Sequence, residues 1–557
     1  MRQNFYQRFV SAPFLRKDRT GEDIWATGAS SDRQSHASFL IFLALFAITF
    51  SLFFNAVRGE FLTWDDDINI THNPHVQGLD LPRVTWMFTD LQQALRYKPL
   101  SWLTWGALYE VNGLDAATFH FGNIVFHALN VGLVFLLISK ILRLSRIGEG
   151  NRRLSFSVAA IAALLWAIHP LRVEPVAWVT GLPYCQSLFF FLLSLVFYLQ
   201  FHGSGDSAPN ARWYWFSVAA FGLALLSYPV VLGGAAVFVV LDVFVLRRVQ
   251  IGRDLWRGTK ARWVWLQKIP FVLMAIGFVS LALFARVNAT GLWSKPQGLN
   301  EFGLIERTMQ SFYVWAYYFW KPIVPVGLSP LYTTLVRFKP GDWQFVLSAA
   351  LVIGVTVLVI WQRRRWPAAL AFWLCHLCLV VPVLGLTERP HYPSDRYDYI
   401  ASVAWFVVIA VGAAVVVQRS QWRVPTFAFA AGVAVVFAVI SLQQILVWRN
   451  TDTLFQRMIS TTDDRSMRVP VQRRWGTLLA RQGRLDEAAA QFSAALEIEP
   501  GFPDLHKRLA DVLEAQQKHT EALHHYREAT RLDPTLVEAR AKAERLASLA
   551  GQPPVKE

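Results

Sequence analysis

The chain alternates long apolar runs with short polar segments, the pattern of a protein that crosses a membrane many times. A backbone in lipid must satisfy its hydrogen bonds internally, so each run predicts a membrane-spanning α-helix. Eleven runs approach spanning length: about 38–57, 119–142, 155–168, 184–201, 213–228, 230–246, 269–287, 343–361, 368–386, 398–418 and 425–446. The sequence therefore predicts an all-α, polytopic membrane domain over residues 38–446.

The segment 305–328 is aromatic-rich and interrupted by Pro322 and Pro325, so it fits either a further span or a helix lying in the membrane interface. Loop charge favours the second interpretation, because Lys and Arg concentrate in cytoplasmic loops. With the basic N-terminus (1–37) inside, the basic loops all fall inside only if 305–328 does not cross; these are 143–153, 247–262, 363–365 and 419–423. We therefore expect eleven spans, with the remaining loops outside: 58–118, 169–183, 288–342, 387–397 and the whole chain after the last span.

The composition agrees with a membrane protein, since 54% of the 557 residues are hydrophobic and only 17% are charged. The formal net charge of +15 comes from the short basic loops, so it does not indicate nucleic-acid binding. The three cysteines, Cys185, Cys375 and Cys378, lie in apolar runs, which favours neither a disulfide framework nor a zinc site.

After about residue 447 the chain becomes rich in Ala, Glu, Arg and Gln with helical spacing. Small and aromatic residues recur in two successive units, each ending in a proline, Pro500 and Pro534, that are 534 − 500 = 34 residues apart. This is the period of the tetratricopeptide repeat. Residues 447–557 are therefore predicted to form a short α-solenoid on the non-cytoplasmic side, which binds a protein partner or serves a purely structural role.

Three consecutive acids, Asp65, Asp66 and Asp67, follow the first span at the start of the long outer loop 58–118. At the mouth of a span such acids can be hydrated, and a plain interpretation makes them a cap or turn at the loop start. A chemical interpretation makes them a general base for a reaction at the membrane surface. Lys98 lies in the same loop beside the aromatic-rich segment 96–105.

The other outer loops supply groups that an anionic, lipid-linked substrate would need: His169, Arg172 and Glu174 in one loop, and Arg389, His391 and Arg396 in another. Arginine suits phosphate because its planar fork donates two parallel hydrogen bonds. Each group also has a structural alternative. His169 would end a helix, Arg172 would pair with Glu174, Asp395 and Arg396 would anchor the tenth span at the interface, and the Trp and Tyr residues near the spans would form an aromatic belt.

A series of segments resembles one family in both order and spacing: "WDDDINITHNPHVQGL", "YKPLSWLTW", "FHFGNIVFHALNVGLVFLL", "AIHPLRVEPVAWVTG", "QKIPF", "KPIVPVGLSPLY", "SDRYDYIASVAW" and "VWRNTDTLF". The chain resembles, almost end to end, the transmembrane and tetratricopeptide-repeat glycosyltransferases. Their eukaryotic members are protein O-mannosyltransferases of the GT-C fold, and the chain is similar to their bacterial relatives.

The resemblance implies a GT-C-like membrane enzyme that moves a sugar from a polyprenyl-phosphate donor to a hydroxyl acceptor, with inversion at the anomeric carbon. It implies that Asp65 or Asp66 is the catalytic base, with the neighbouring acid orienting the acceptor or binding an ion. A divalent cation near Asp65 and Asp66 is the one cofactor considered. Arg172, Arg396 and Arg389 are expected to bind the donor phosphate, and the expected substrate-binding residues are His169, Glu174, Lys98 and His391.

The chain departs from the family pattern at two places. Leu182, Pro183 and Tyr184 stand where relatives carry a basic and then an acidic or amide residue, and Tyr228 stands where relatives carry a lysine. These departures leave the donor open and admit a non-catalytic member.

Three functions follow as competing hypotheses. The first is transfer to protein Ser or Thr hydroxyls presented by the repeats. The second is the same chemistry on a lipid or glycan acceptor, and the third is a non-enzymatic membrane scaffold that acts through its repeats. The expected location is a bacterial inner membrane, in contact with membrane lipids, with the site and the repeats on the periplasmic side.

Overall fold

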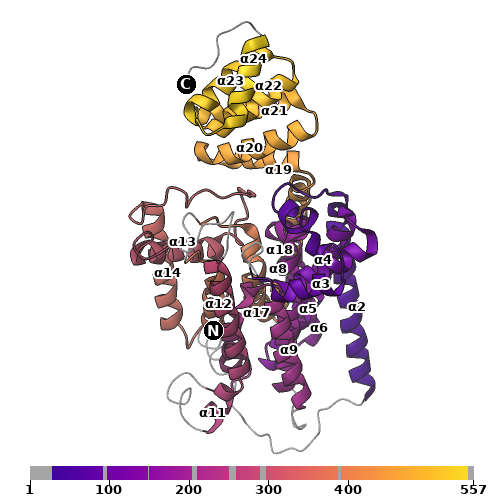
Figure 1. The fold of residues 1–557 in the computed structure, drawn as a ribbon. Coiled ribbons are helices and arrows are strands. Elements are labelled where there is room, and N and C mark those ends of the chain that lie inside the picture. The colour runs from indigo at the N-terminus through magenta and orange to yellow at the C-terminus, as the bar shows by residue number, and fades with distance from the viewer. Residues whose placement is uncertain are drawn as a thin grey trace, which may run out of the picture.

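The computed structural model describes residues 28–91, 97–148, 150–202, 210–249, 259–288, 297–386 and 391–549. Within these ranges every regular element is a helix, which confirms the all-α class. Figure 1 shows a bundle of upright helices with a separate stack of helices above it. The bundle consists of α2 (Gly28–Phe53), η1 (Phe54–Arg58), η2 (Asp67–Thr71), η3 (Pro74–Val76), α3 (Leu81–Thr89), α4 (Pro99–Asn112), α5 (Ala116–Leu144), α6 (Arg152–Ala167), η5 (Pro170–Arg172), α7 (Val173–Ala177), η6 (Val179–Gly181), α8 (Leu182–His202), α9 (Ala211–Ser227), η7 (Pro229–Val231), α10 (Gly234–Val240), η8 (Leu241–Val245), α11 (Thr259–Leu266), α12 (Ile269–Asn288), α13 (Leu304–Trp320), α14 (Trp343–Trp361), α15 (Pro367–Val380), η10 (Val381–Val383), η11 (Asp395–Tyr397), α16 (Asp398–Ala401), α17 (Val403–Val416) and α18 (Ser420–Val447).

Six helices of the described chain are long and apolar enough to cross a membrane, and two bent pairs raise the number to eight. The bent pairs are Arg152–Ala167 with Pro170–Ala177, and Asp395–Ala401 with Val403–Val416. The three other predicted spans are 17-residue helical stretches: Ala211–Ser227, Pro229–Val245 and Pro367–Val383. Every predicted run is thus helical, while the number of eleven spans stays a prediction.

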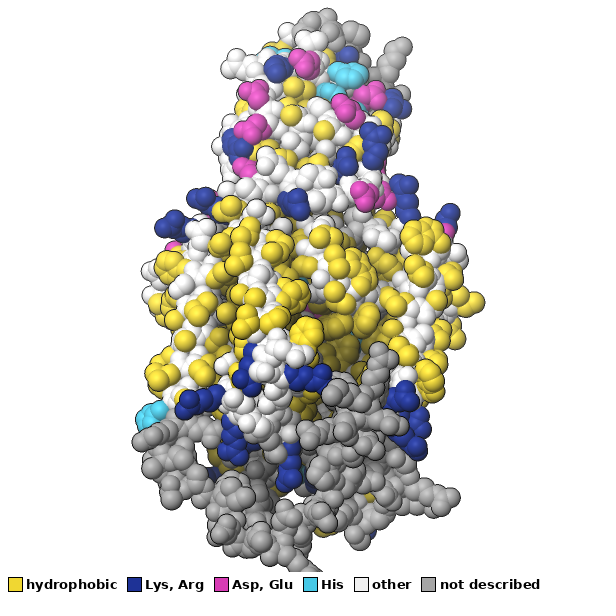
Figure 2. Space-filling view, turned by 180° about the vertical axis from the view of Figure 1, so that it is seen from behind, with side chains coloured by type: hydrophobic (Ala, Val, Ile, Leu, Met, Phe, Trp, Pro, Cys, Tyr) yellow, Lys and Arg dark blue, Asp and Glu magenta, His cyan; other side chains and the backbone are white. Residues whose placement is uncertain are grey.

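Hydrophobic side chains cover the middle of the molecule on the face shown in Figure 2, and Lys and Arg side chains lie both below and above this band. Gly148 of the loop 143–153 lies beside Gln418, one residue before the loop 419–423, and Arg248 of the loop 247–262 contacts His202 at the end of α8. The loop 143–153 therefore lies next to the residue that precedes the loop 419–423, while the sidedness of the four basic loops stays a prediction.

The segment 305–328 packs along α15 and then turns back. Gln310 donates to the carbonyls of Leu384 and Gly385, and further along α13 the Phe319 ring contacts Trp373. Beyond the prolines, the carbonyl of Leu328 accepts from Arg457 of the repeat side. These contacts join α13 to α15 and the end of the segment to α19 (Thr451–Thr461), and the prediction that the segment does not cross the membrane stays a prediction.

The outer loop 58–118 is folded rather than irregular. Helices α3 and α4, with η2 and η3, pack around a buried cluster that includes Met87, Trp102 and Trp105. Pro99 begins α4, where a missing N–H costs nothing, and Asp80 caps α3 by accepting from Arg83 N at 3.0 Å. This small helical layer holds the aspartates against the top of the bundle.

The C-terminal stack contains α19 (Thr451–Thr461), α20 (Arg465–Arg481), α21 (Leu485–Ile498), α22 (Pro503–Ala515), α23 (His519–Leu532) and α24 (Val537–Leu549). Its helices follow one another as antiparallel neighbours, with the small and aromatic residues of the repeat buried between them: Ala488, Phe492, Ala495, Ala522, Tyr526 and Ala529. Gly476 contacts the Phe492 ring, where a Cβ would lie 2.9 Å from it. The predicted repeats are therefore present as a solenoid.

Candidate active site

Asp65 and Asp66 lie in a tight turn between η1 and η2, and Asp67 begins η2; the three residues are called the acid turn below. Asp65 has φ 72°, a left-handed conformation that Asp tolerates better than most residues, and its side chain is partly exposed. Its carbonyl accepts from the backbone N of Asn69 at 2.9 Å and from Asn69 Nδ2 at 2.8 Å. The turn thus presents the Asp65 carboxylate at the surface while its backbone is fixed by η2.

Asp66 differs from Asp65, because its side chain is completely buried. Its Oδ2 accepts from Leu62 N at 2.9 Å, and its Oδ1 accepts from Thr180 N at 3.0 Å and from the Thr180 hydroxyl. Burial raises the pKa of Asp66 to about 7, although the hydrogen bonds from Thr180 and Leu62 act in the opposite direction. The expectation of hydrated acids is therefore wrong for Asp66, which joins the turn to the segment 173–181.

That segment, α7 followed by η6, forms one wall of the candidate site. It folds back tightly at Gly181, where a Cβ would lie 2.2 Å from the carbonyl oxygen of Pro175. Trp178 donates from Nε1 to the carbonyl of Trp64 at 3.2 Å, one residue before the aspartates. The wall therefore contacts the acid turn twice, through Thr180 and through Trp178.

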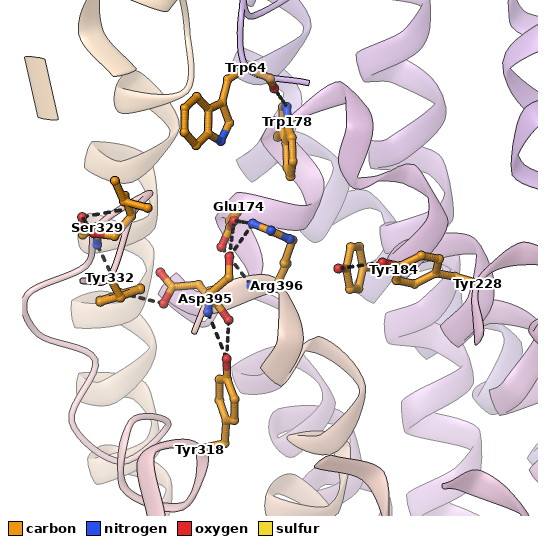
Figure 3. A network of polar contacts seen from close by, with 12 residues as sticks. Trp64, Glu174, Trp178, Tyr184, Tyr228, Tyr318, Ser329, Tyr332, Asp395 and Arg396 are labelled. Carbon is orange, nitrogen blue, oxygen red and sulfur yellow. Dashed lines mark hydrogen bonds and ion pairs between the residues drawn. The ribbon is translucent and has the colours of Figure 1, made fainter. Parts of the chain in front are cut away.

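The same wall carries an ion pair between Glu174 and Arg396, at the centre of Figure 3. Glu174 Oε2 accepts from Arg396 N at 2.9 Å, and Glu174 Oε1 accepts from the Ser394 hydroxyl at 2.6 Å. The Arg396 guanidinium carbon lies 5.1 Å from the Trp178 ring centroid and 4.9 Å from that of Tyr397. Among the described residues only the backbone N and Nη1 of Arg396 donate hydrogen bonds, so its Nε and Nη2 keep their donors for an anion.

Asp395 belongs to the same network but was expected only as an interface anchor. It is buried and accepts from the Tyr332 hydroxyl at 2.7 Å, while Tyr318 bonds the backbone of the preceding Ser394 (Figure 3). Tyr332 and Tyr318 come from the segment 305–342. Sequence reasoning missed them because nothing in the spacing of that aromatic-rich segment says which tyrosine faces the acids.

Arg172 lies outside this network. It pairs with Asp398 at 2.6 Å, and both side chains are almost completely buried. The alternative of an Arg172–Glu174 pair is therefore wrong: each of the two residues pairs with a partner from the segment 395–398 instead. Arg172 Nε and Nη1 have no hydrogen-bond partner in the described chain, but no surface of Arg172 is open to a donor phosphate.

His169 begins η5 and connects elements rather than facing the aspartates. Its Nδ1 accepts from Leu171 N at 3.2 Å, and its Nε2 lies 2.9 Å from the carbonyl oxygen of Pro322. Because a carbonyl only accepts, Nε2 carries the proton, and both ring nitrogens are in use.

Of the remaining predicted site residues, Lys98 lies near the acid turn and His391 lies near Arg396. Lys98 donates from Nζ to Asn69 Oδ1 at 2.9 Å, which places it beside the acid turn, although it is buried. His391 stacks on Tyr397 with ring centroids 6.1 Å apart, and the same Tyr397 ring lies beside the Arg396 guanidinium. Arg389 lies outside the described residues.

The two departures from the family pattern meet in space. Tyr184 and Tyr228, 44 residues apart, have hydroxyls 3.4 Å apart and ring centroids 4.8 Å apart. Tyr184 also lies 6.2 Å from the Tyr397 ring. An aromatic pair therefore stands beside the Arg396 network where the resemblance implies polar groups (Figure 3).

Asp66 does not fit a divalent cation near the acid turn. Both of its oxygens face N–H or O–H donors, whose positive ends repel a cation, and the described residues contain no group of three or more metal-ligating side chains.

Comparison with known proteins adds to this geometry. A tetratricopeptide-repeat family model matches residues 473–537. The chain is 27% identical over 347 residues to the human protein O-mannosyl-transferase TMTC2, covering 57% of this chain and 38% of that protein. It is 23% identical to mouse TMTC2, covering 82% of this chain and 62% of the relative, and 21% identical to a Caenorhabditis elegans protein O-mannosyl-transferase, covering 88% and 63%.

The chain spans about half the length of the curated relatives it matches. The matched region nevertheless includes most of this chain in several of them, and the repeats are matched independently. These findings establish a family-level relationship between this chain and the TMTC protein O-mannosyl-transferases, as its motifs indicated.

Proposed function

We propose that the chain is a membrane glycosyltransferase that moves a sugar from a polyprenyl-phosphate donor to a protein Ser or Thr hydroxyl on the non-cytoplasmic side. The observation that carries the proposal is the wall 173–181, which binds the acid turn through Thr180 and Trp178 and the Arg396 cation through Glu174 and Trp178. The acid turn and the Arg396 cation are thereby attached to the same segment of the bundle.

In this proposal Asp65 is the base, because it is the partly exposed carboxylate of the turn, while Asp66 anchors the turn to the wall. Asp65 removes the proton from the acceptor hydroxyl as its oxygen attacks the anomeric carbon. The bond from that carbon to the phosphate oxygen breaks, and the polyprenyl phosphate leaves with the electron pair and with inversion. Arg396 stabilises the departing phosphate, a task for a fixed cation in a water-poor site.

The lipid part of such a donor has a suitable place in the bundle. A groove of about 510 Å³ lies between α6, α17 and α18, lined by apolar side chains such as Trp405, Phe429 and Val433. Its Phe406 and Phe437 flank His169 at the end of α6. An isoprenoid chain fits a groove of this chemistry, because both surfaces are apolar and neither requires hydrogen bonds.

A non-catalytic scaffold is the second candidate, and a specific observation favours it. Arg172 and Arg396 are each paired with a buried carboxylate, so the structure already satisfies much of their charge. Transfer to a lipid or glycan acceptor is a variant of the first proposal.

The test compares the purified wild-type protein with Asp65→Asn and with Glu60→Gln, an exposed acid of the same loop. Transfer is measured from a panel of polyprenyl-phosphate sugars, mannose first, to Ser/Thr peptides and to glycolipids. General-base assistance contributes about 10²- to 10⁴-fold, so Asp65→Asn should lose that much activity and still melt like wild type. Full activity in Asp65→Asn would remove Asp65 as the base, and a wild-type protein inactive on the whole panel would support the scaffold.

A further inference from the structure

The first helices of the repeat domain are bound directly to the turn that carries the aspartates. Glu60 N donates to the carbonyl of Arg449 at 2.9 Å, and Thr63 N donates to the Thr451 hydroxyl at 3.1 Å. The Trp64 and Phe455 rings meet edge to face, with centroids 6.2 Å apart. The segment 60–67 is therefore held between the membrane bundle below it and α19 above it.

One charged side chain of the next helix, α20, reaches the same turn. The Arg474 guanidinium carbon lies 5.2 Å from the Trp64 ring centroid, and Arg474 Nη2 lies 3.8 Å from Asp67 Oδ2. Asp67 Oδ1 is buried and has no hydrogen-bond partner in the described chain. Arg474 thus contacts Trp64 and Asp67, the residues on either side of Asp65 and Asp66.

Contacts between α19 and α20 fix the position of Arg474. Asp452 of α19 accepts from Trp475 Nε1 at 2.7 Å and pairs with Arg484 at 2.5 Å, which ties α20 and the start of α21 to α19. Asn450 begins α19 with a capping box completed by Thr453. Since α19 is bound to residues 60–64, the path from Arg474 back to the aspartates contains no long unsupported loop.

We propose that Arg474 is a positioning residue of the transfer site, supplied by the repeat domain. It holds Trp64 by stacking and Asp67 by charge, and so keeps the left-handed turn at Asp65 in the orientation that the reaction needs. A guanidinium suits both tasks, because its planar face stacks on an indole while its edge faces a carboxylate. The first repeat is thereby part of the site as well as a surface for a partner. This inference rests on the proposed function for its catalytic part only.

The test compares Arg474→Ala and Arg474→Lys, in the middle of α20, with Arg481→Ala, an exposed arginine at the C-terminal end of the same helix, in the full-length protein. The first measurement is hydrogen exchange of the backbone amides of residues 62–71, which needs no enzymatic activity. We expect faster exchange in Arg474→Ala than in Arg481→Ala, with Arg474→Lys in between because it keeps the charge and loses the planar stacking.

The second measurement is kcat and KM for transfer. A displaced reacting group can cost on the order of 10²-fold, so Arg474→Ala should lower kcat by about that factor while KM for the donor stays near the wild-type value. Partial recovery in Arg474→Lys, with Arg481→Ala at full activity, would support the proposal.

The two measurements separate the possible failures. Unchanged exchange in Arg474→Ala would overturn the positioning role whatever the activity. Faster exchange with unchanged kcat would overturn its catalytic part. If the wild type transfers no sugar, the proposed function fails, while the exchange result still decides whether Arg474 holds the turn.

Discussion

The ion pairs of the candidate site and those of the repeat domain are built differently. In the membrane bundle, Glu174 pairs with Arg396 and Arg172 with Asp398 across 222 and 226 residues of sequence, and the two carboxylates are at most 2% exposed. In the repeats, ion pairs recur between the first helices of successive repeats, and the two paired residues are 31 positions apart in sequence. The pairs are Arg473–Asp504, Lys542–Asp511 and Arg545–Glu514, with Lys507–Glu538 at the same spacing of 538 − 507 = 31. These repeat pairs are partly exposed.

The difference shows that the two regions depend on charge to different degrees. Exposed pairs gain little, because water screens them and long side chains lose freedom, so the repeats are stabilised mainly by buried residues such as Ala488, Phe492 and Tyr526. A buried pair is costly to form and far more costly to leave half-formed. Single substitutions should therefore be severe in the bundle and mild in the solenoid.

The largest expected effect is that of Arg172→Met. It leaves the Asp398 carboxylate buried without its cation, and breaking a buried pair in this way costs about 3–5 kcal/mol. Thermal inactivation in detergent should occur at a clearly lower temperature than in wild type. The double variant Arg172→Met with Asp398→Leu should recover most of the loss, because replacing both charges by apolar groups is often nearly neutral. A double variant as unstable as the single one would contradict a structural role for the pair.

A medium effect is expected from pH at Asp66. Its pKa is about 7 in the folded protein and 3.8 as the ordinary value, so the folded state holds the proton more tightly. The protonated Asp66 carboxyl therefore stabilises the folded state. This contribution to the free energy of unfolding is fully present below about pH 4 and declines as the pH rises through about 7. The melting-temperature difference between wild type and Asp66→Asn should therefore shrink over this window, since asparagine does not titrate there. A difference that is constant with pH would contradict the burial of a protonated Asp66.

The smallest effect is expected from Arg545→Ala, which removes one of the ion pairs between neighbouring repeats, the pair with Glu514. Its cost should be below about 1 kcal/mol and should fall further at high salt, because the pair is exposed. Local stability is measured by hydrogen exchange of α22 and α24 at low and high ionic strength. Unfolding of the whole solenoid in Arg545→Ala would show that the ion pairs between repeats, rather than the buried residues, hold the repeats together.

Much of the fold could be predicted because its signals are local. Apolar runs of spanning length predict helices wherever they occur, and the 34-residue spacing of Pro500 and Pro534 predicts the solenoid, since each repeat packs only on its neighbours. The acid turn was recognisable from three adjacent aspartates after the first span. Which of them is exposed was not, because Asp65 and Asp66 differ through a backbone angle and through a contact with Thr180, 114 residues away.

The sequence by itself determined the helical class, the repeats and the segments from which a site could be built, because helix formation and nearest-neighbour stacking depend on residues close in the chain. Only the tertiary structure decided the pairing of these segments. It buried Asp66 and Arg172, joined the acid turn and Arg396 to the same wall, brought Tyr184 against Tyr228, and placed Arg474 over Trp64. Such contacts arise from how the bundle packs, and the partner of a buried charge is set by which distant segment that packing brings within a few ångströms.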